Sequence, residues 1–303
     1  MSEPNLFLVG APKAGTTSVA ELLGSHKDVF LGYPKEPCFL SSDLGSRPSS
    51  VVLNSMSDYL RIYVGGTSHR YRLDASTTYL RSSVAVERAM ELSPDAAFIV
   101  CLRNPVDLLV AFHQEMIFNL NEDEPDVGRA VDLWRSRRNG RDLPSRCTDP
   151  QHLDYLSIAS LATQLESVMN FVPSDRLLLL RFELIGQEPD VVEQHLVDFL
   201  GLSTGFDKSL GHRKSRRSHR FGPIAVAIQD PPAALEPAVR VTKRLVRRNP
   251  LIRKATTSVL TRPTALTSPS PDVRRRLLEL LRPEIERLEM LTGWDLSDWS
   301  ADA

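Results

Sequence analysis

The sequence predicts an α/β fold: a doubly wound, mainly parallel sheet flanked by helices, with a helical C-terminal extension. Three observations support this. Short apolar runs alternate with helical patterns along the chain, as in folds whose parallel strands are joined by crossover helices. The run AFIVCL at residues 97–102 is continuously apolar, which is typical of a strand buried on both faces. A glycine-containing loop follows the first apolar run directly and opens a helix.

Each predicted strand is a short apolar run that ends in polar residues. The predicted strands are residues 6–9, 29–31, 71–74, 97–102 and 177–182. The predicted helices have apolar residues at helical spacing and lie near residues 17–25, 83–92, 105–120, 153–171, 188–200 and 272–292. Asp272 is the expected N-cap of the last helix, and Gly293 follows its end. Ligands of such sheets bind at the carboxyl ends of the strands, so the residues after each run are the candidate site residues.

Charge is unevenly distributed along the chain, with an excess of basic residues in the C-terminal third. A chain of 303 residues can bury a full core, and its formal net charge is only −1. Between Arg213 and Arg262, however, 13 Lys and Arg residues face two acidic residues. We therefore predict a catalytic domain over residues 1–236 and a basic helical extension over residues 237–303 that packs on the same domain. The basic excess indicates an anionic partner.

The segment 237–262 reads as a basic amphipathic helix with eight basic residues and no acidic one. Peripheral contact with an anionic membrane surface, an anionic acceptor, RNA, and packing on the acidic main body are alternative explanations. The sequence shows no RRM, KH or helix-turn-helix signature, which argues against nucleic acid. No apolar run is long enough for a membrane span, and the N-terminus has no signal-peptide pattern, so we expect a cytoplasmic protein. The widely spaced Cys38, Cys101 and Cys147 predict neither disulfides nor a metal site.

The segment GAPKAGTTS, residues 10–18, has the layout of a phosphate-binding loop between a strand and a helix. Gly10 and Gly15 permit the tight turn. Lys13 lies inside the loop, whereas a Walker A motif places its lysine directly after the second glycine. The residues expected to surround a bound anion are Pro12, Lys13, Ala14, Gly15, Thr16, Thr17 and Ser18.

This loop resembles the 5′-phosphosulfate loop of sulfotransferases that use 3′-phosphoadenosine 5′-phosphosulfate (PAPS), whose pattern is close to P-K-x-G-T-[ST]. The resemblance implies a fold like that of P-loop nucleotide-binding proteins, PAPS as cosubstrate, and its desulfated form PAP as product. It also implies that Lys13 neutralises charge on the leaving phosphate oxygen. No residue cluster in the sequence calls for a metal ion.

A second motif, RNPVDLLVAFHQEM, follows the apolar run at 97–102. It resembles the family's 3′-phosphate motif R-N-P-x-x-x-x-x-S, and Arg103 matches the arginine that holds the 3′-phosphate with its guanidinium fork. Ala111 stands where the family has a serine, so one hydroxyl contact worth about 1.5–3 kcal/mol is missing. The resemblance also implies a basic loop near residues 211–222 that covers the nucleotide, with Arg216 and Arg217 as the candidate ligands of the 3′-phosphate.

A general base is needed if the acceptor is a hydroxyl. The segment YPKEPCFL resembles a carbohydrate-sulfotransferase segment in which a glutamate precedes an aromatic pair, which implies Glu36 as the base. Lys35 beside it is a candidate contact of the acceptor or of the donor sulfate. Asp74 is an alternative base, but we expect Asp74 and Tyr79 to be acceptor-site or supporting residues. His113, ten residues into the helix after Arg103, is a further candidate for acceptor contact.

The combined motifs predict a PAPS-dependent sulfotransferase. It would move a sulfuryl group in line to a hydroxyl of a carbohydrate, glycolipid, lipid or other small-molecule acceptor. Two alternatives remain open from the sequence. One is a non-catalytic protein that binds PAP or another nucleotide, and the other is an atypical P-loop kinase.

Overall fold

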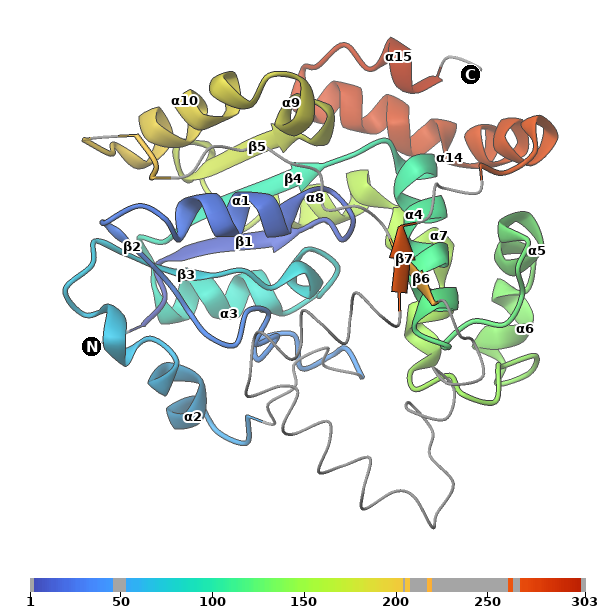
Figure 1. Cartoon of the computed structure of the whole chain (residues 1–303), viewed down its shortest axis with the longest axis horizontal. Coiled ribbons are helices and arrows are strands. Elements are labelled where there is room, and N and C mark those ends of the chain that lie inside the picture. The colour runs from blue at the N-terminus through green and yellow to red at the C-terminus, as the bar shows by residue number, and fades with distance from the viewer. Residues whose placement is uncertain are drawn as a thin grey trace.

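The computed structural model describes residues 3–45, 53–203, 205–207, 217–219, 261–263 and 268–300. A five-stranded parallel sheet with the strand order β2-β3-β1-β4-β5 forms its centre, and helices pack around it (Figure 1). The strands are β1 (Leu6–Gly10), β2 (Val29–Leu31), β3 (Tyr71–Asp74), β4 (Ala97–Leu102) and β5 (Leu177–Arg181). The predicted doubly wound α/β fold is confirmed.

The strand order makes the carboxyl end of β1 a switch point. After β1 the chain moves to one side of it, through β2 and β3, and later crosses to the other side to form β4 and β5. Parallel pairing of β1 with both β3 and β4 brings all the strand carboxyl ends to one edge of the sheet. Ligands of open α/β sheets bind at such a point.

The structure has helices in all six of the predicted regions that it describes, although one of them is divided, and it adds helices at residues 56–61, 127–132, 134–138, 182–187 and 297–300 that were not predicted. The helices are α1 (Thr16–Leu23), α2 (Met56–Arg61), α3 (Ala85–Leu92), α4 (Pro105–Phe118), α5 (Val127–Asp132), α6 (Trp134–Arg138), α7 (Tyr155–Ala159), α8 (Leu161–Met169), α9 (Phe182–Gln187), α10 (Pro189–Leu200), α14 (Pro271–Thr292) and α15 (Ser297–Ser300). Short 3₁₀ turns are η1 (Val64–Gly66), η2 (Thr77–Leu80), η3 (Pro150–Leu153) and η4 (Ser174–Arg176).

The single helix predicted over residues 153–171 is wrong, because the chain breaks at Ser160. This residue has φ −76° and ψ 61°, which is outside the helical region and separates α7 from α8. The side-chain amide of Gln164 donates to the carbonyls of Ser157 (2.7 Å) and Ile158 (3.3 Å). Carbonyl groups at the end of α7 therefore receive hydrogen bonds from a residue of α8. Neither glycine nor proline marks the break in the sequence.

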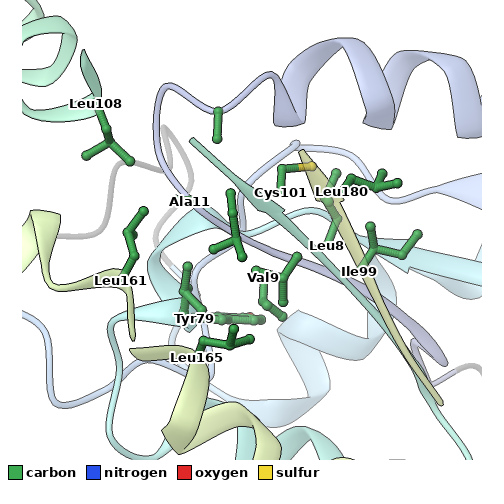
Figure 2. Close-up of a cluster of buried hydrophobic side chains, with 14 of the residues drawn as sticks. Leu8, Val9, Ala11, Tyr79, Ile99, Cys101, Leu108, Leu161, Leu165 and Leu180 are labelled. Carbon is green, nitrogen blue, oxygen red and sulfur yellow. The ribbon is translucent and has the colours of Figure 1, made fainter. Parts of the chain in front are cut away.

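The core lies between the central strands and the helices. All five residues of β1 are buried, and Phe7 stacks on Phe98 of the neighbouring β4 with ring centroids 5.1 Å apart. Figure 2 shows Val9 of β1 and Tyr79 of η2 close together, with Leu165 of α8 beside them. Burial of the central strands explains their continuous apolar sequences.

Helix α14 connects the C-terminal part of the chain to the core. Its buried residues form one stripe: Leu277, Leu278, Leu281, Ile285 and Leu288. The expected N-cap Asp272 is corrected to Ser270, whose side chain accepts from the N–H of Val273, while Asp272 lies in the first turn. Gly293 ends the helix with φ 68°, as its position predicts.

Only a few residues of the predicted basic segments are described. Residues 217–219 form β6 (Arg217–His219), which pairs in antiparallel fashion with β7 (Thr261–Pro263). The predicted helix over 237–262 otherwise lies outside the described residues. Within the part of the chain that the structure describes, no helix is both long enough and apolar enough to cross a membrane.

Candidate active site

The predicted site residues lie at the carboxyl edge of the sheet. The loop with Lys13 follows β1, the segment with Lys35 and Glu36 follows β2, and Arg103 follows β4 directly. Asp74 is the last residue of β3. Residues separated by up to 90 positions in the sequence thus share one edge because the strands are parallel.

Two glycines fix the path of the loop after β1. Gly15 is the N-cap of α1 with φ 82°, and a Cβ built there would lie 2.9 Å from Cδ1 of Ile185 and 3.2 Å from Cδ2 of Phe182. At Gly10, with φ 150°, a Cβ would lie 2.7 Å from the Cβ of Leu80. Both positions require glycine, because the left-handed backbone and the close neighbours each exclude a side chain.

The start of α1 can hold an anion. The first N–H groups of a helix have no partner within the helix, and its N-terminus carries a partial positive charge. The first turn of α1 contains no acidic residue, and Thr16, Thr17 and Ser18 place hydroxyl groups there. This combination fits a phosphate or sulfate group.

Lys13 stands at the tip of the loop and is held by an ion pair. It has φ 61°, and its Nζ lies 3.3 Å from Oε2 of Glu115 on α4. The two side chains are 30% and 39% exposed, so the pair is open to solvent on one side. A left-handed backbone at a non-glycine residue is costly, and such positions cluster at functional sites.

Arg103 joins the two motifs that the sequence indicates. It is buried, its Nη1 donates to the carbonyl of Lys13 at 3.0 Å, and its guanidinium carbon lies 4.4 Å from the ring centroid of Phe182. The arginine after β4 therefore supports the loop after β1 directly. Ala111 is also buried on α4 and brings no hydroxyl group to this region.

The helix after Arg103 begins at a well-defined cap. The side-chain oxygen of Asn104 accepts from the N–H groups of Val106 (2.9 Å) and Asp107 (3.4 Å), and Pro105 is the first helical residue. The side-chain amide of Asn104 donates to the carbonyl of Trp299 at 3.0 Å. The C-terminal part of the chain thus fixes the orientation of the residue beside Arg103.

Lys35 connects the loop to the candidate base. Its Nζ donates to Oγ1 of Thr17 at 3.0 Å and to Oε1 of Glu36 at 3.0 Å. The Glu36 side chain is 27% exposed, so its carboxylate is accessible at this edge. Glu36 and the phosphate-binding loop are therefore linked through one ammonium group.

The segment around Glu36 has a strained backbone that neighbouring hydroxyls stabilise. Glu36 has φ 60° and Cys38 has φ 51°. The N–H of Cys38 donates to Oγ of Ser76 (3.0 Å), and the N–H of Leu40 donates to the hydroxyl of Tyr79 (3.3 Å). Burial raises the pKa of the Cys38 thiol to about 12, so this thiol stays neutral and is no nucleophile.

Asp74 is the centre of that hydroxyl network and is itself inaccessible. It is 1% exposed and accepts from Oγ of Ser76 (2.6 Å) and from the hydroxyls of Tyr59 (2.6 Å) and Tyr79 (3.0 Å). Burial raises the pKa of Asp74, although these hydrogen bonds oppose the change. Asp74 and Tyr79 are thus connected by hydrogen bonds to the segment that carries Glu36.

His113 is buried away from the loop. Its Nε2 lies 2.8 Å from the carbonyl oxygen of Glu124, and its ring packs against Tyr155 with centroids 5.5 Å apart. Burial lowers the pKa of His113, which keeps the ring neutral near pH 7. These contacts give the ring a structural role.

Several site features could not be predicted from local sequence. Glu115 pairs with Lys13, Phe182 supports Arg103, and Trp299 orients Asn104. Of the basic loop, Arg216 lies outside the described residues, and Arg217 belongs to β6. In the described ranges, no group of three or more His, Cys, Asp or Glu residues could hold a metal ion.

A solved structure resembles nearly the whole chain. A sulfotransferase from Alicyclobacillus acidocaldarius superposes with a TM-score of 0.71 at 22% sequence identity, and the alignment covers 99% of this chain and 100% of that one. At this identity the similarity establishes the fold.

Characterised relatives are similar over part of their length. The human bifunctional heparan sulfate N-deacetylase/N-sulfotransferase 1 is 25% identical over 206 residues, which is 67% of this chain and 23% of that protein. Its counterpart from Xenopus tropicalis is 26% identical over 205 residues, again 67% and 23%. The chain thus spans about a quarter of the length of these relatives.

The family assignment rests on a longer match. A model of the sulfotransferase domain matches residues 3–215, which include the loop with Lys13, the segment with Glu36 and the motif with Arg103. This range is more than half of the chain. The protein therefore belongs to the sulfotransferase domain family.

Proposed function

We propose that the protein transfers the sulfuryl group of PAPS to a hydroxyl of a carbohydrate, glycolipid or other small-molecule acceptor. One observation carries the proposal. The guanidinium of Arg103 donates to the carbonyl of Lys13, so two anion-binding motifs meet beside the exposed carboxylate of Glu36. A donor with separate 5′- and 3′-phosphate groups needs two such motifs at a fixed separation.

The donor site consists of the loop 12–18 and Arg103. The N-terminus of α1 and the hydroxyls of Thr16, Thr17 and Ser18 would bind the 5′-phosphosulfate. Arg103 would bind the 3′-phosphate, together with the basic residues Arg216 and Arg217. Because Lys13 of the loop and Arg103 after β4 supply the positive charges, the proposed donor site needs no metal ion.

The transfer step needs a base and a group that stabilises the leaving oxygen. Glu36 accepts the proton of the acceptor hydroxyl, whose oxygen forms the new bond to sulfur while the bond between sulfur and the phosphate oxygen breaks. Lys13 stabilises the negative charge that develops on this phosphate oxygen. Lys35 connects Glu36 to the loop through hydrogen bonds of 3.0 Å to Thr17 and 3.0 Å to Glu36.

The acceptor class follows from the relatives and from the base. The relatives are named as N-sulfotransferases of heparan sulfate, a glycan, which supports a carbohydrate acceptor, whereas the choice of a hydroxyl rests on the carboxylate alone. An accessible carboxylate suits an alcohol, because the alcohol must lose a proton as the new bond forms. We assign Asp74 and Tyr79 to support of the Glu36 segment, and Lys35 to the boundary between donor and acceptor.

Calorimetric titration with PAP, in the presence of EDTA and with ATP as the control, tests the donor site. We expect micromolar PAP binding without metal and no comparable ATP binding. ATP binding that magnesium restores would instead indicate a kinase. Tight PAP binding without transfer of labelled sulfate to any of a panel of glycans, glycolipids and alcohols would indicate a non-catalytic nucleotide-binding protein.

A further inference from the structure

The ion pair between Lys13 and Glu115 has no place in the transfer step described above. Oε2 of Glu115 lies 3.3 Å from Nζ of the lysine that is proposed to stabilise the leaving oxygen. A carboxylate in this place would repel the phosphosulfate of a donor. Its position therefore requires a reason other than donor binding.

Glu115 reaches the loop from a defined face of α4. It lies four residues after Ala111, so the two residues share one face of the helix one turn apart. His113 lies two residues before Glu115 and points elsewhere, to the carbonyl of Glu124. Ala111 has no hydroxyl group to offer to the loop. On this face of α4, Glu115 is the residue that contacts Lys13.

We propose that Glu115 is a positioning residue that competes with the donor for Lys13. In the donor-free protein it holds the ammonium group over the loop. When the phosphosulfate binds, the ammonium leaves Glu115 for the donor, and after transfer Glu115 takes the ammonium back as PAP departs. This inference rests on the proposed function of the loop as a PAPS site.

The size of the effect follows from the exposure of the pair. Ion pairs of this kind contribute little, because solvent screens them and both side chains lose freedom. Removal of the competing carboxylate should therefore tighten PAP binding only about two- to fivefold. The change should appear as slower release of PAP, because affinity changes within one site occur mainly in the dissociation rate.

The experiment measures PAP affinity and PAP release for the full-length protein and its variants, without metal. Glu115→Gln should bind PAP about two- to fivefold more tightly than the wild type. Glu115→Asp should behave like Glu115→Gln, because the shorter side chain keeps its charge but does not reach Nζ of Lys13. In a Lys13→Ala background, Glu115→Gln should change PAP affinity by less than about 1.5-fold. Glu286→Gln, an exposed residue on α14, is the control for the lost charge.

Three results would overturn the inference. The first is a Glu115→Gln variant with wild-type PAP affinity. The second is a Glu115→Asp variant with wild-type affinity beside a tighter Glu115→Gln variant, which would show simple repulsion of the donor. The third is an equal gain from Glu115→Gln with and without Lys13. If the wild type itself bound no PAP, the proposed function would fail together with this inference; in the other cases only the inference fails.

Discussion

At the scale of single residues, the main feature of the site is the pair formed by the carboxylate of Glu36 and the ammonium group of Lys35. Glu36 and Lys35 are neighbours in sequence, and both side chains are about a quarter exposed. Lys35 also holds Thr17 of the donor loop, so the charge of Glu36 is fixed relative to the loop before any donor binds. A base that is already in place reduces the reorganisation needed during the transfer step.

Replacement of Glu36 by glutamine tests the assignment of the base. Glu36→Gln should lower the turnover of sulfate transfer by about 10²–10⁴-fold, because an amide cannot accept the acceptor's proton. PAP affinity should change less than about twofold, since Glu36 contacts the loop only through Lys35. Turnover and PAP binding would be measured on the same preparation.

The control for this variant is again Glu286→Gln, which removes one negative charge from the surface of α14. Turnover of Glu36→Gln within threefold of the wild type would remove Glu36 from the role of base.

At the scale of elements, the segment after β2 depends on the element after β3. The strained backbone at Glu36 and Cys38 is held by hydroxyls of Ser76 and Tyr79, and Asp74 binds both hydroxyls. Each hydroxyl donates to the carboxylate and accepts from a backbone N–H, so the network passes from β3 to the base segment. Asp74, the alternative candidate for the base, thus helps to hold the segment that carries Glu36.

Replacement of Asp74 by asparagine tests this support. Two hydroxyls donate to Oδ2 of Asp74, and an amide nitrogen in that position accepts no hydrogen bond. The free energy of unfolding should fall by about 1–3 kcal/mol, and turnover should fall while PAP affinity stays the same. Denaturant titration and calorimetry would measure these quantities, with the exposed Asp175→Asn as the control. If Asp74→Asn lowered the stability but left turnover at the wild-type level, the hydroxyl network would not be needed to position Glu36.

A second element-scale feature stabilises residues 122–142, beside α4. The fully buried carboxylate of Glu122 accepts from Nη1 (2.6 Å) and Nη2 (2.8 Å) of Arg137 on α6, and from the hydroxyl of Tyr155 (2.8 Å). Burial alone would raise the pKa of Glu122, but the bonds from Arg137, the N–H of Glu124 and Tyr155 lower it below its usual value.

This lowered pKa predicts a pH dependence. A carboxylate with a lowered pKa in the folded state stabilises the protein above its unfolded pKa of about 4.3 and loses this contribution as pH falls through the folded pKa. Glu122→Gln should therefore cost about 3–5 kcal/mol at pH 7, because Arg137 is left buried without its partner. The difference from the wild type should shrink below about pH 4. Urea titrations at several pH values measure it, and a constant difference down to pH 3 would contradict the explanation.

At the scale of the whole molecule, the C-terminal helices pack against elements that carry or adjoin the site. Helix α14 packs beside α4 and α8 (Figure 1), and the carboxylate of Glu284 accepts from the N–H of Ala162 at 2.9 Å, at the start of α8. Arg274 pairs with Asp107 of α4 at 2.8 Å. Trp299 of α15 is buried. The donor motif at Arg103 therefore depends on residues almost 200 positions later.

Removal of the Trp299 side chain tests this dependence. Trp299→Ala should lower the free energy of unfolding by about 3–5 kcal/mol, because a large buried ring leaves a cavity. PAP affinity should also fall, because loss of the ring that anchors α15 lets the backbone carbonyl of residue 299 shift away from Asn104, which it orients beside Arg103. Met290→Ala on the exposed face of α14 is the control and should change stability by less than about 0.5 kcal/mol. If PAP affinity were unchanged at a temperature where the variant is folded, α15 would contribute to the stability of the fold but not to PAP binding.

The sheet, the loop 10–18 and the family could be predicted from the sequence alone. Continuous apolar runs predict buried parallel strands, because no face of such a strand meets water. The loop 10–18 and the motif after β4 are local patterns, each complete within about a dozen residues. The residues of each motif are neighbours in the chain, so the positions of the motifs could be predicted from local sequence alone.

The tertiary structure decided which charged groups meet. Glu115 on Lys13, Phe182 under Arg103 and Trp299 beside Asn104 come from elements that only the folded chain brings together. Burial, which no local pattern of polar residues reveals, made Asp74 a supporting residue and left Glu36 accessible. Pairing and burial depend on the packing of distant elements, and for that reason the roles of these carboxylates could not be assigned from sequence.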